Sequence, residues 1–324
     1  MAGWPQEPTD PTTGTFALQQ PTDPTTGTFW GAARSGFVVS CMAVGVVAAG
    51  VAQGATVEAY AAGDIANCTK VAAAESVAAI TARMIPPGAT VLVPGDAIYQ
   101  PPTLANYQSC YQPTWGTHLA TTLIVPGNHD YARGRADDFL EYFGAAAGYH
   151  GYFARSVGDW LVIGLDSNLR GANLERQLHW LEATLKDHAD SRCTLALWHM
   201  PLFSSGPHRG DGNHMRPFWQ ALDTYGADLV LNGHEHFFEA FDPRDANGRP
   251  AETGLREFVV GTGGAELYGF WRPPYSSRAR IKRHGVLHLT LEESAYAWEF
   301  IDIRGNVSDP GRATCRRSGE QPET

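Results

Sequence analysis

Six short apolar runs recur along the chain, and each ends in a polar residue or a histidine. They occupy residues 56–64, 90–96, 122–128, 160–166, 194–199 and 228–234. Runs of this length, bounded by turn-forming residues, are typical of β-strands. We therefore predict strands whose carboxyl ends carry polar side chains, which is where functional groups gather in an α/β sheet.

Helical patterns lie between these runs. One predicted helix, 174–187, has an apolar face made of Leu174, Leu178, Leu181 and Leu185. A second has an apolar face made of Met215, Phe218, Trp219, Leu222 and Tyr225. Gly226 is placed to end that helix.

The chain is strand-rich from Glu257 onward. Residues 285–291 and 296–303 alternate between apolar and polar positions and are joined by a short polar turn. Strands alternating with helices, followed by a strand-rich end, predict an α/β (mixed α+β) fold. We expect two packed mixed β-sheets flanked by helices, in one domain over residues 56–315.

The first 55 residues have a different character. The string PTDPTTGTF occurs at residues 8–16 and again at 21–29, and such a repeat cannot bury apolar surface, so we predict that residues 1–33 are disordered. In residues 34–55, Arg34 precedes the apolar stretch 36–52, as in a signal peptide. A retained membrane anchor is the alternative, and a buried helix is a third.

These segments set the expected location. The domain 56–315 and a polar tail, 316–324, follow the signal or anchor. We expect the protein to be secreted or to lie at the cell surface, with membrane contact only if residues 36–52 are retained as an anchor.

The composition narrows the choice of partner. The 324 residues include 12 histidines and carry a formal net charge of -10. An acidic chain of this kind argues against a nucleic-acid partner, because nucleic-acid binders normally show a basic face. It also repels anionic substrates unless bound metal reverses the local field.

Five strand ends carry the chemistry of a metal site. They read GDIANC (63–68), GDAIY (95–99), GNHD (127–130), WHMP (198–201) and GHEH (233–236). A single Gly-Asp pair is commonly a turn, and a single histidine is commonly a core residue. Together, however, Asp, Asn and Tyr oxygens mixed with imidazoles suit two metal ions such as Fe, Mn or Zn, and not a thiolate zinc finger.

In this order the five motifs resemble those of the calcineurin-like metallophosphoesterases. GDAIY is similar to the second motif of the purple acid phosphatases. The likeness covers nearly all of residues 57–315 and includes SCYQPTWG, LDSN, HMPLFSSG and FVVGTGG, strings like those of exported bacterial members. It implies an α/β/β/α sandwich, in agreement with the pattern of strands and helices.

The resemblance also implies a ligand set. The first metal would be held by Asp64, Asp96, Tyr99 and His236. The second would be held by Asp96, Asn128, His199 and His234, with Asp96 bridging. The implied ions are iron paired with zinc, manganese or a second iron.

Two departures bear on the first metal. Ala66 stands where most of the superfamily has a histidine. Purple acid phosphatases also lack that histidine and use a tyrosine, as Tyr99 would here, but they have a glycine at the position of Ala66. Tyr99 has the alternative reading of a packed aromatic residue at a strand end.

The implied reaction is the hydrolysis of a phosphate monoester, on a small phosphorylated substrate, by a hydroxide bound to the binuclear metal centre. His129 resembles the proton donor of the family, and Asp130 either orients it or caps a loop. His208 is placed like a substrate-facing histidine of purple acid phosphatases, or else lies in a solvated loop. A phosphodiesterase acting on nucleotides is the alternative, and an inactive surface metal-binding module is a remote one.

The cysteines fit an exported protein. Cys41 lies in the apolar stretch and would leave with a cleaved signal. The other four allow three pairings in an oxidising compartment, or remain as buried free thiols. We favour Cys68–Cys110 and Cys193–Cys315, because Cys68 and Cys110 each follow closely on a motif.

Overall fold

A computed structural model describes residues 56–68, 75–271 and 276–316. The expectations for residues 1–33 and 34–55, and for nearly all of the tail 316–324, lie outside the described residues. All of these described residues belong to one compact unit. Among the described helices, none is long and apolar enough to cross a membrane.

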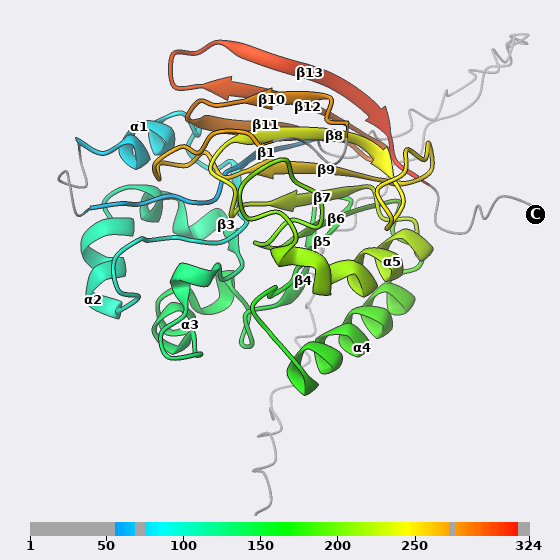
Figure 1. Cartoon of the computed structure of the whole chain (residues 1–324), viewed down its shortest axis with the longest axis horizontal. Helices are drawn as coiled ribbons and strands as arrows, with labels where there is room; N and C mark the ends of the chain where they lie inside the picture. The colour runs from blue at the N-terminus through cyan, green and yellow to red at the C-terminus, as the bar shows by residue number, and fades with distance from the viewer. Residues whose placement is uncertain (1–55, 69–74, 272–275, 317–324) are drawn as a thin grey trace, which may run out of the picture. The chain divides into compact units, whose positions relative to one another are not determined.

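Within the described residues, six strands form the first sheet, in the order β13-β12-β11-β1-β2-β3 (Figure 1). Its parallel half consists of β1 (Val57–Ala61), β2 (Thr90–Val93) and β3 (Thr122–Ile124). An antiparallel meander continues from the edge of β1 and consists of β11 (Gly285–Leu291), β12 (Ala295–Asp302) and β13 (Val307–Thr314).

The second sheet has seven described strands, in the order β10-β8-β9-β7-β6-β5-β4. Its parallel centre consists of β5 (Trp160–Gly164), β6 (Cys193–Leu197), β7 (Leu229–Asn232) and β9 (Leu255–Val260). The antiparallel strands are β4 (Phe153–Val157), β8 (Phe238–Arg244) and β10 (Ala279–Ile281). The predicted strands are therefore confirmed.

The helices cover the outer faces of the two sheets. On the first sheet they are α1 (Val77–Arg83), α2 (Leu104–Asn106), η2 (Tyr107–Tyr111), η3 (Trp115–Thr121), α3 (Asp137–Phe143) and η5 (Gly144–Ala146). On the second sheet they are α4 (Ala172–Asp187), η6 (Asp211–Met215) and α5 (Arg216–Thr224). Figure 1 shows α4 and α5 together on one side of the strands.

Three buried clusters hold these layers together. One joins the inner faces of the two sheets through residues such as Leu92, Leu195 and Phe300. The others lie between each sheet and its helices. The expected α/β/β/α sandwich is confirmed. In the predicted 174–187 helix, Leu181 and Leu185 are buried as its apolar face requires.

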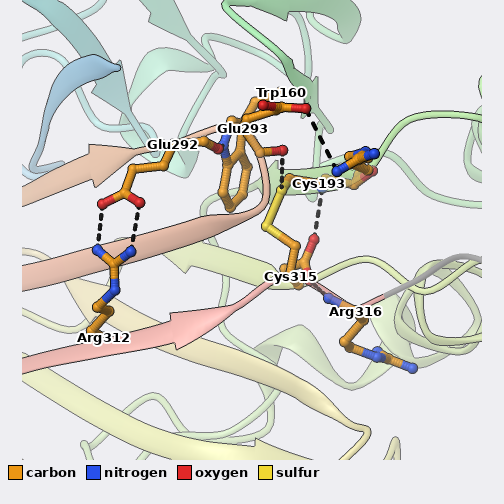
Figure 2. The surroundings of a disulfide bond; sticks show 10 residues. Trp160, Cys193, Glu292, Glu293, Arg312, Cys315 and Arg316 are labelled. Atoms are coloured by element: carbon orange, nitrogen blue, oxygen red, sulfur yellow. Dashed lines mark hydrogen bonds and ion pairs between the residues drawn. A yellow bond between two sulfur atoms is a disulfide. The ribbon is translucent and has the colours of Figure 1, made fainter. Parts of the chain in front are cut away.

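Both favoured disulfides are present. Cys68–Cys110 ties the loop after β1 to η2. Cys193–Cys315 joins the start of β6 to the residue after β13, and so links the two sheets (Figure 2). Beside it, Trp160 Nε1 donates a hydrogen bond of 2.8 Å to the Glu292 carbonyl oxygen. The disulfide thus fixes the end of β13 to the second sheet, and the Trp160 hydrogen bond fixes the turn between β11 and β12 to it.

Candidate metal centre

The candidate ligands follow strands of both sheets. Asp64, Asp96 and Asn128 come after β1, β2 and β3, and Asn128 begins the short helix η4 (Asn128–Asp130). His199 follows β6, and His234 and His236 lie between β7 and β8. Carboxyl ends of parallel strands meet at one edge of each sheet, and the fold places these two edges together.

The structure brings the four candidates for the first metal together. The Tyr99 hydroxyl lies 2.7 Å from Asp64 Oδ1, 3.1 Å from Asp96 Oδ2 and 2.7 Å from His236 Nε2. His236 Nε2 is itself 3.2 Å from Asp64 Oδ1. The Tyr99 hydroxyl therefore points into this set and is not a packed aromatic group alone.

The candidates for the second metal form an adjoining set that shares Asp96. His199 Nε2 lies 3.0 Å from Asn128 Oδ1, 3.4 Å from Asp96 Oδ2 and 3.3 Å from His234 Nδ1. Asp64, Asp96 and His199 are buried, and each offers a ligand atom within 4.8 Å of the others. Asp96 thus reaches both sets, as a bridging ligand must.

Hydrogen bonds on the far side of each imidazole test whether a metal fits. His199 Nδ1 lies 2.9 Å from the Pro94 carbonyl, and His236 Nδ1 lies 2.6 Å from the Glu266 carbonyl. Because a carbonyl only accepts, these nitrogens carry the protons, and in the neutral imidazoles that a metal would bind both Nε2 atoms present lone pairs to the centre.

His234 is oriented in the same manner by a carboxylate. Its Nε2 lies 3.1 Å from Asp211 Oδ2, which leaves the lone pair of Nδ1 facing His199. In the neutral imidazoles, Nε2 of His199 and of His236 faces carboxylate or amide oxygens, and Nδ1 of His234 faces His199. Such an arrangement of acceptors needs a positive charge among them. The donor set fits two metal ions.

Asp96 and His199 shift each other's pKa values, because the two side chains are buried next to each other. Burial raises the pKa of Asp96, but the neighbouring His199 and His129 together outweigh burial and hold that pKa well below its usual range. Burial lowers the pKa of His199, whereas Asp96 and Asp64 raise it to about 9. Asp96 therefore stays ionised, and without metal His199 binds a second proton that a bound ion would displace. The charge of that ion would supply the local reversal of field that an acidic chain needs.

Backbone strain is concentrated at the candidate ligands. Among the described non-glycine residues, positive φ occurs at Asp64 (57°), Asp96 (54°) and His234 (70°), and otherwise only at Arg133 and Asp309. Such conformations cost on the order of 1–3 kcal/mol each and persist where the surroundings impose them. They are typical of sites where side-chain placement matters more than local stability.

Glycines of the motifs leave room for the carboxylates. A Cβ at Gly127 would lie 2.0 Å from Asp96 Oδ1, and one at Gly233 would lie 2.6 Å from Asp64 Oδ2. The glycine before Asn128 and the glycine before His234 therefore serve the ligands of the neighbouring motifs.

The candidate proton donor His129 lies beside the first set. Its backbone N donates to Asp96 Oδ1 at 2.8 Å, and its exposed ring contacts Tyr99 with ring centroids 4.5 Å apart. Asp130 accepts hydrogen bonds from Gly127 N at 2.9 Å, Ala97 N at 3.2 Å and the Tyr107 hydroxyl at 3.0 Å. These bonds favour the loop-capping alternative for Asp130.

His208 lies on the other side of the centre. Its ring centroid is 5.0 Å from that of His234 and 5.2 Å from that of Tyr268, whose ring stacks on His236 at 3.9 Å. The side chain is 41% exposed, so one side of the ring remains open to a substrate. His129 and His208 therefore flank the two donor sets.

Two residues at the centre were not predicted from the sequence. Asp211 contacts the candidate ligand His234, but it begins the short helix η6 in a polar stretch that gives no pattern. Glu235 is buried between His234 and His236 in GHEH. Its position inside that motif is the only feature of the sequence that could have indicated a role at the centre.

The comparisons with known proteins agree with this geometry. A purple acid phosphatase from yellow lupin (Lupinus luteus) superposes with a TM-score of 0.66 at 17% identity, over 81% of this chain and 54% of that one. This chain thus spans about half the length of the lupin enzyme. GAP50, the anchor in the inner membrane complex of Plasmodium, gives 0.64 at 15% identity, over 82% and 90% of the two chains. A dimetal phosphatase from Danio rerio gives 0.50 at 13%, over 80% and 99%.

At these identities the structural neighbours show the fold. No curated protein sequence matches the chain significantly. The family model of the calcineurin-like phosphoesterases matches residues 62–238, which is more than half of the chain and contains all five motifs. The chain therefore belongs to the calcineurin-like phosphoesterase family.

Proposed function

We propose that this calcineurin-like phosphoesterase hydrolyses phosphate monoesters at the centre built around Asp96. Its family makes it a metal-dependent phosphoesterase. The preference for monoesters is the proposal, and it is supported by the tyrosine in the second motif, whose hydroxyl lies 2.7 Å from Asp64 Oδ1 and 2.7 Å from His236 Nε2. That feature resembles purple acid phosphatases, and one of them has the same fold.

We propose that Asp64, Asp96, Tyr99 and His236 hold the first metal, and that Asp96, Asn128, His199 and His234 hold the second. Two bound ions in such a centre activate water and neutralise the charge of the phosphoryl group. The chain's own residues then position the ester and supply a proton to the leaving alkoxide. His129, exposed beside Tyr99, is the proposed donor, and His208 the proposed substrate contact.

The first ion is proposed to be iron, because a phenolate oxygen is a ligand that suits a trivalent ion. Zinc, manganese or a second iron would fill the second set. The substrate is proposed to be a small phosphorylated molecule and not a nucleic acid, given the net charge of -10. Two disulfides support an oxidising location, secreted or at the cell surface.

Elemental analysis together with a panel of phosphate esters tests the proposal. The purified protein should contain about two equivalents of metal and should release phosphate from an aryl phosphate faster than it cleaves the bis-aryl diester. Asp96→Ala should lose both metals and hydrolysis, because this carboxylate reaches both donor sets. Asp137→Ala, a change at an exposed aspartate of α3, is the matched control and should keep both.

The outcomes separate the alternatives. Faster cleavage of the diester would assign the centre to a phosphodiesterase. Two metals without turnover of any ester would indicate an inactive metal-binding module. An Asp96→Ala protein that retains two equivalents would show that Asp96 is not the bridge.

A further inference from the structure

Three buried glutamates lie behind the loop of residues 202–208, which connects β6 towards η6 and carries His208. Glu257 Oε1 accepts from Phe203 N at 3.3 Å. Glu239 accepts from Ser205 N at 2.9 Å and from Ser205 Oγ at 2.7 Å. Glu235, Glu239 and Glu257 are each 0% exposed. Buried carboxylates of this kind persist only where donors satisfy them, and here the 202–208 loop provides donors.

Glu235 differs from the other two because it holds His208 itself. Its Oε1 accepts from His208 N at 2.8 Å. Its Oε2 lies 3.5 Å from His208 Nδ1. Glu235 Oε2 and His208 Nδ1 are both shielded from solvent, and neither atom has a hydrogen-bond partner among the residues that the structure describes.

The glycine in the loop permits this approach. A Cβ at Gly206 would lie 2.1 Å from Glu235 Oε2, so a larger residue would displace the carboxylate. A separation of 3.5 Å is longer than a hydrogen bond, but bonds of a catalytic site are often long in the free protein and shorten with substrate. A small rotation of the His208 ring would bring Nδ1 within hydrogen-bonding range of Glu235 Oε2.

The contact determines which edge of the imidazole faces the substrate. When a carboxylate lies at Nδ1, it orients the ring and leaves Nε2 at the opposite edge to contact the reacting group. His208 is partly exposed beside His234, on the side of the second donor set. Its Nε2 is thereby available to a phosphoryl oxygen.

The side chains of the GHEH motif point in two directions. His234 and His236 point into the two donor sets, whereas Glu235, between them, points to the 202–208 loop. We propose that Glu235 is a positioning residue that fixes the backbone and ring of His208 so that Nε2 contacts the phosphoryl group. This inference rests on the proposed function and extends it by naming the residue that couples the ligand turn to the substrate contact.

A double-mutant cycle tests whether Glu235 acts through His208. The proteins are wild type, Glu235→Gln, His208→Ala and the double variant, each loaded with metal and titrated calorimetrically with inorganic phosphate. Each single change should weaken phosphate binding about 10-fold, and the double variant should also be about 10-fold weaker and not 100-fold. Metal content by elemental analysis should stay at two equivalents in all four.

A matched control separates positioning from general support of the loop. Glu239→Gln removes a carboxylate that holds the same loop without touching His208. Its effect on phosphate binding should multiply with that of His208→Ala. If Glu235→Gln does not fold, Glu235→Asp, which withdraws the carboxylate by one methylene, enters the same cycle with the same expectation.

The results divide clearly. Three results would overturn the inference. The losses could multiply in the Glu235/His208 double variant, neither single change could affect phosphate binding, or Glu235→Gln could lose metal. Because the cycle measures phosphate binding, it decides the role of Glu235 even if the enzyme prefers diesters. Conversely, if the protein hydrolyses monoesters but the losses of the two single variants multiply in the double variant, the proposed function stands and the inference about Glu235 is wrong.

Discussion

At the scale of single residues, Tyr99 is the side chain that reports most directly on the metal. Burial raises the pKa of Tyr99 well above its ordinary value, and Asp64 and Asp96 raise it further. The phenol thus stays neutral unless a cation outweighs these effects, and a trivalent ion at hydrogen-bonding range of the hydroxyl would do so.

If the first ion is Fe(III), we expect a visible charge-transfer band from the Tyr99 phenolate and a coloured protein. Tyr99→Phe should lose the band while its circular dichroism is unchanged, because only one hydroxyl is removed. His129→Gln, which changes a neighbouring ring outside the ligand set, should keep the colour. A coloured Tyr99→Phe protein would mean that another residue ligates the iron, and a colourless native protein would remove the iron assignment.

At the scale of elements, Asp302 stabilises the hairpin of β12 and β13. It accepts hydrogen bonds from Arg304 N at 2.9 Å and Asn306 N at 3.0 Å, and its second oxygen lies 3.1 Å from Arg283 Nη1. Burial raises the pKa of Asp302, but hydrogen bonds from Asn306, Arg304 and Arg283 lower it to about 2.

A pKa that is lower in the folded state than the unfolded value of about 3.9 gives stability above pH 4. That contribution is lost as the pH falls through about 2. Asp302→Asn should therefore lower the melting temperature at pH 7 by about 2–4 °C, for a loss of roughly 1 kcal/mol. The difference from wild type should shrink between pH 4 and pH 2. The control is Asp159→Asn, in the exposed turn between β4 and β5, which should not change the melting temperature relative to wild type. If the melting temperatures of Asp302→Asn and wild type differ by the same amount at every pH, Asp302 does not have this role.

Elements differed in how far the sequence could predict them. The parallel strands β1, β2 and β7 were predicted because they are buried apolar runs that end in glycine and a polar residue. The edge strand β4 was not predicted, because Arg155 and Ser156, which point to opposite faces of the strand, are both exposed and leave no apolar run. Local pattern indicates a strand only where burial imposes one.

The same limit applies to the candidate centre. His234 and His236 stand out in a glycine-flanked motif, whereas Asp211, at the start of η6, comes next to His234 only after folding. Glu235 could be noticed but not given a role, because its partner His208 is distant in the chain and adjacent only after folding.

At the scale of the whole molecule, the centre joins the two sheets. Asp64, Asp96 and Asn128 extend from the first sheet, and His199, His234 and His236 from the second. Without metal, Asp64 and Asp96 are buried side by side on a backbone with positive φ, and protonated His199 is the neighbour that offsets the charge of Asp96. Bound ions would supply more positive charge and link ligands of both sheets, so we expect metal to contribute to the stability of the entire fold.

Ligand linkage sets the size of this contribution. A metal present at about 1,000 times its dissociation constant stabilises the folded state by about 4 kcal/mol. For a domain of this size, 1 kcal/mol shifts the melting temperature by about 2–4 °C. Chelation should therefore lower the melting temperature of the wild type by on the order of 10 °C, and re-addition of metal should restore it. Asp96→Ala, which removes the ligand common to both sets, should melt at one temperature with or without chelator. If wild type also melts at the same temperature in both conditions, the metals do not join the sheets, and the stability of the sandwich rests on its apolar layers and disulfides alone.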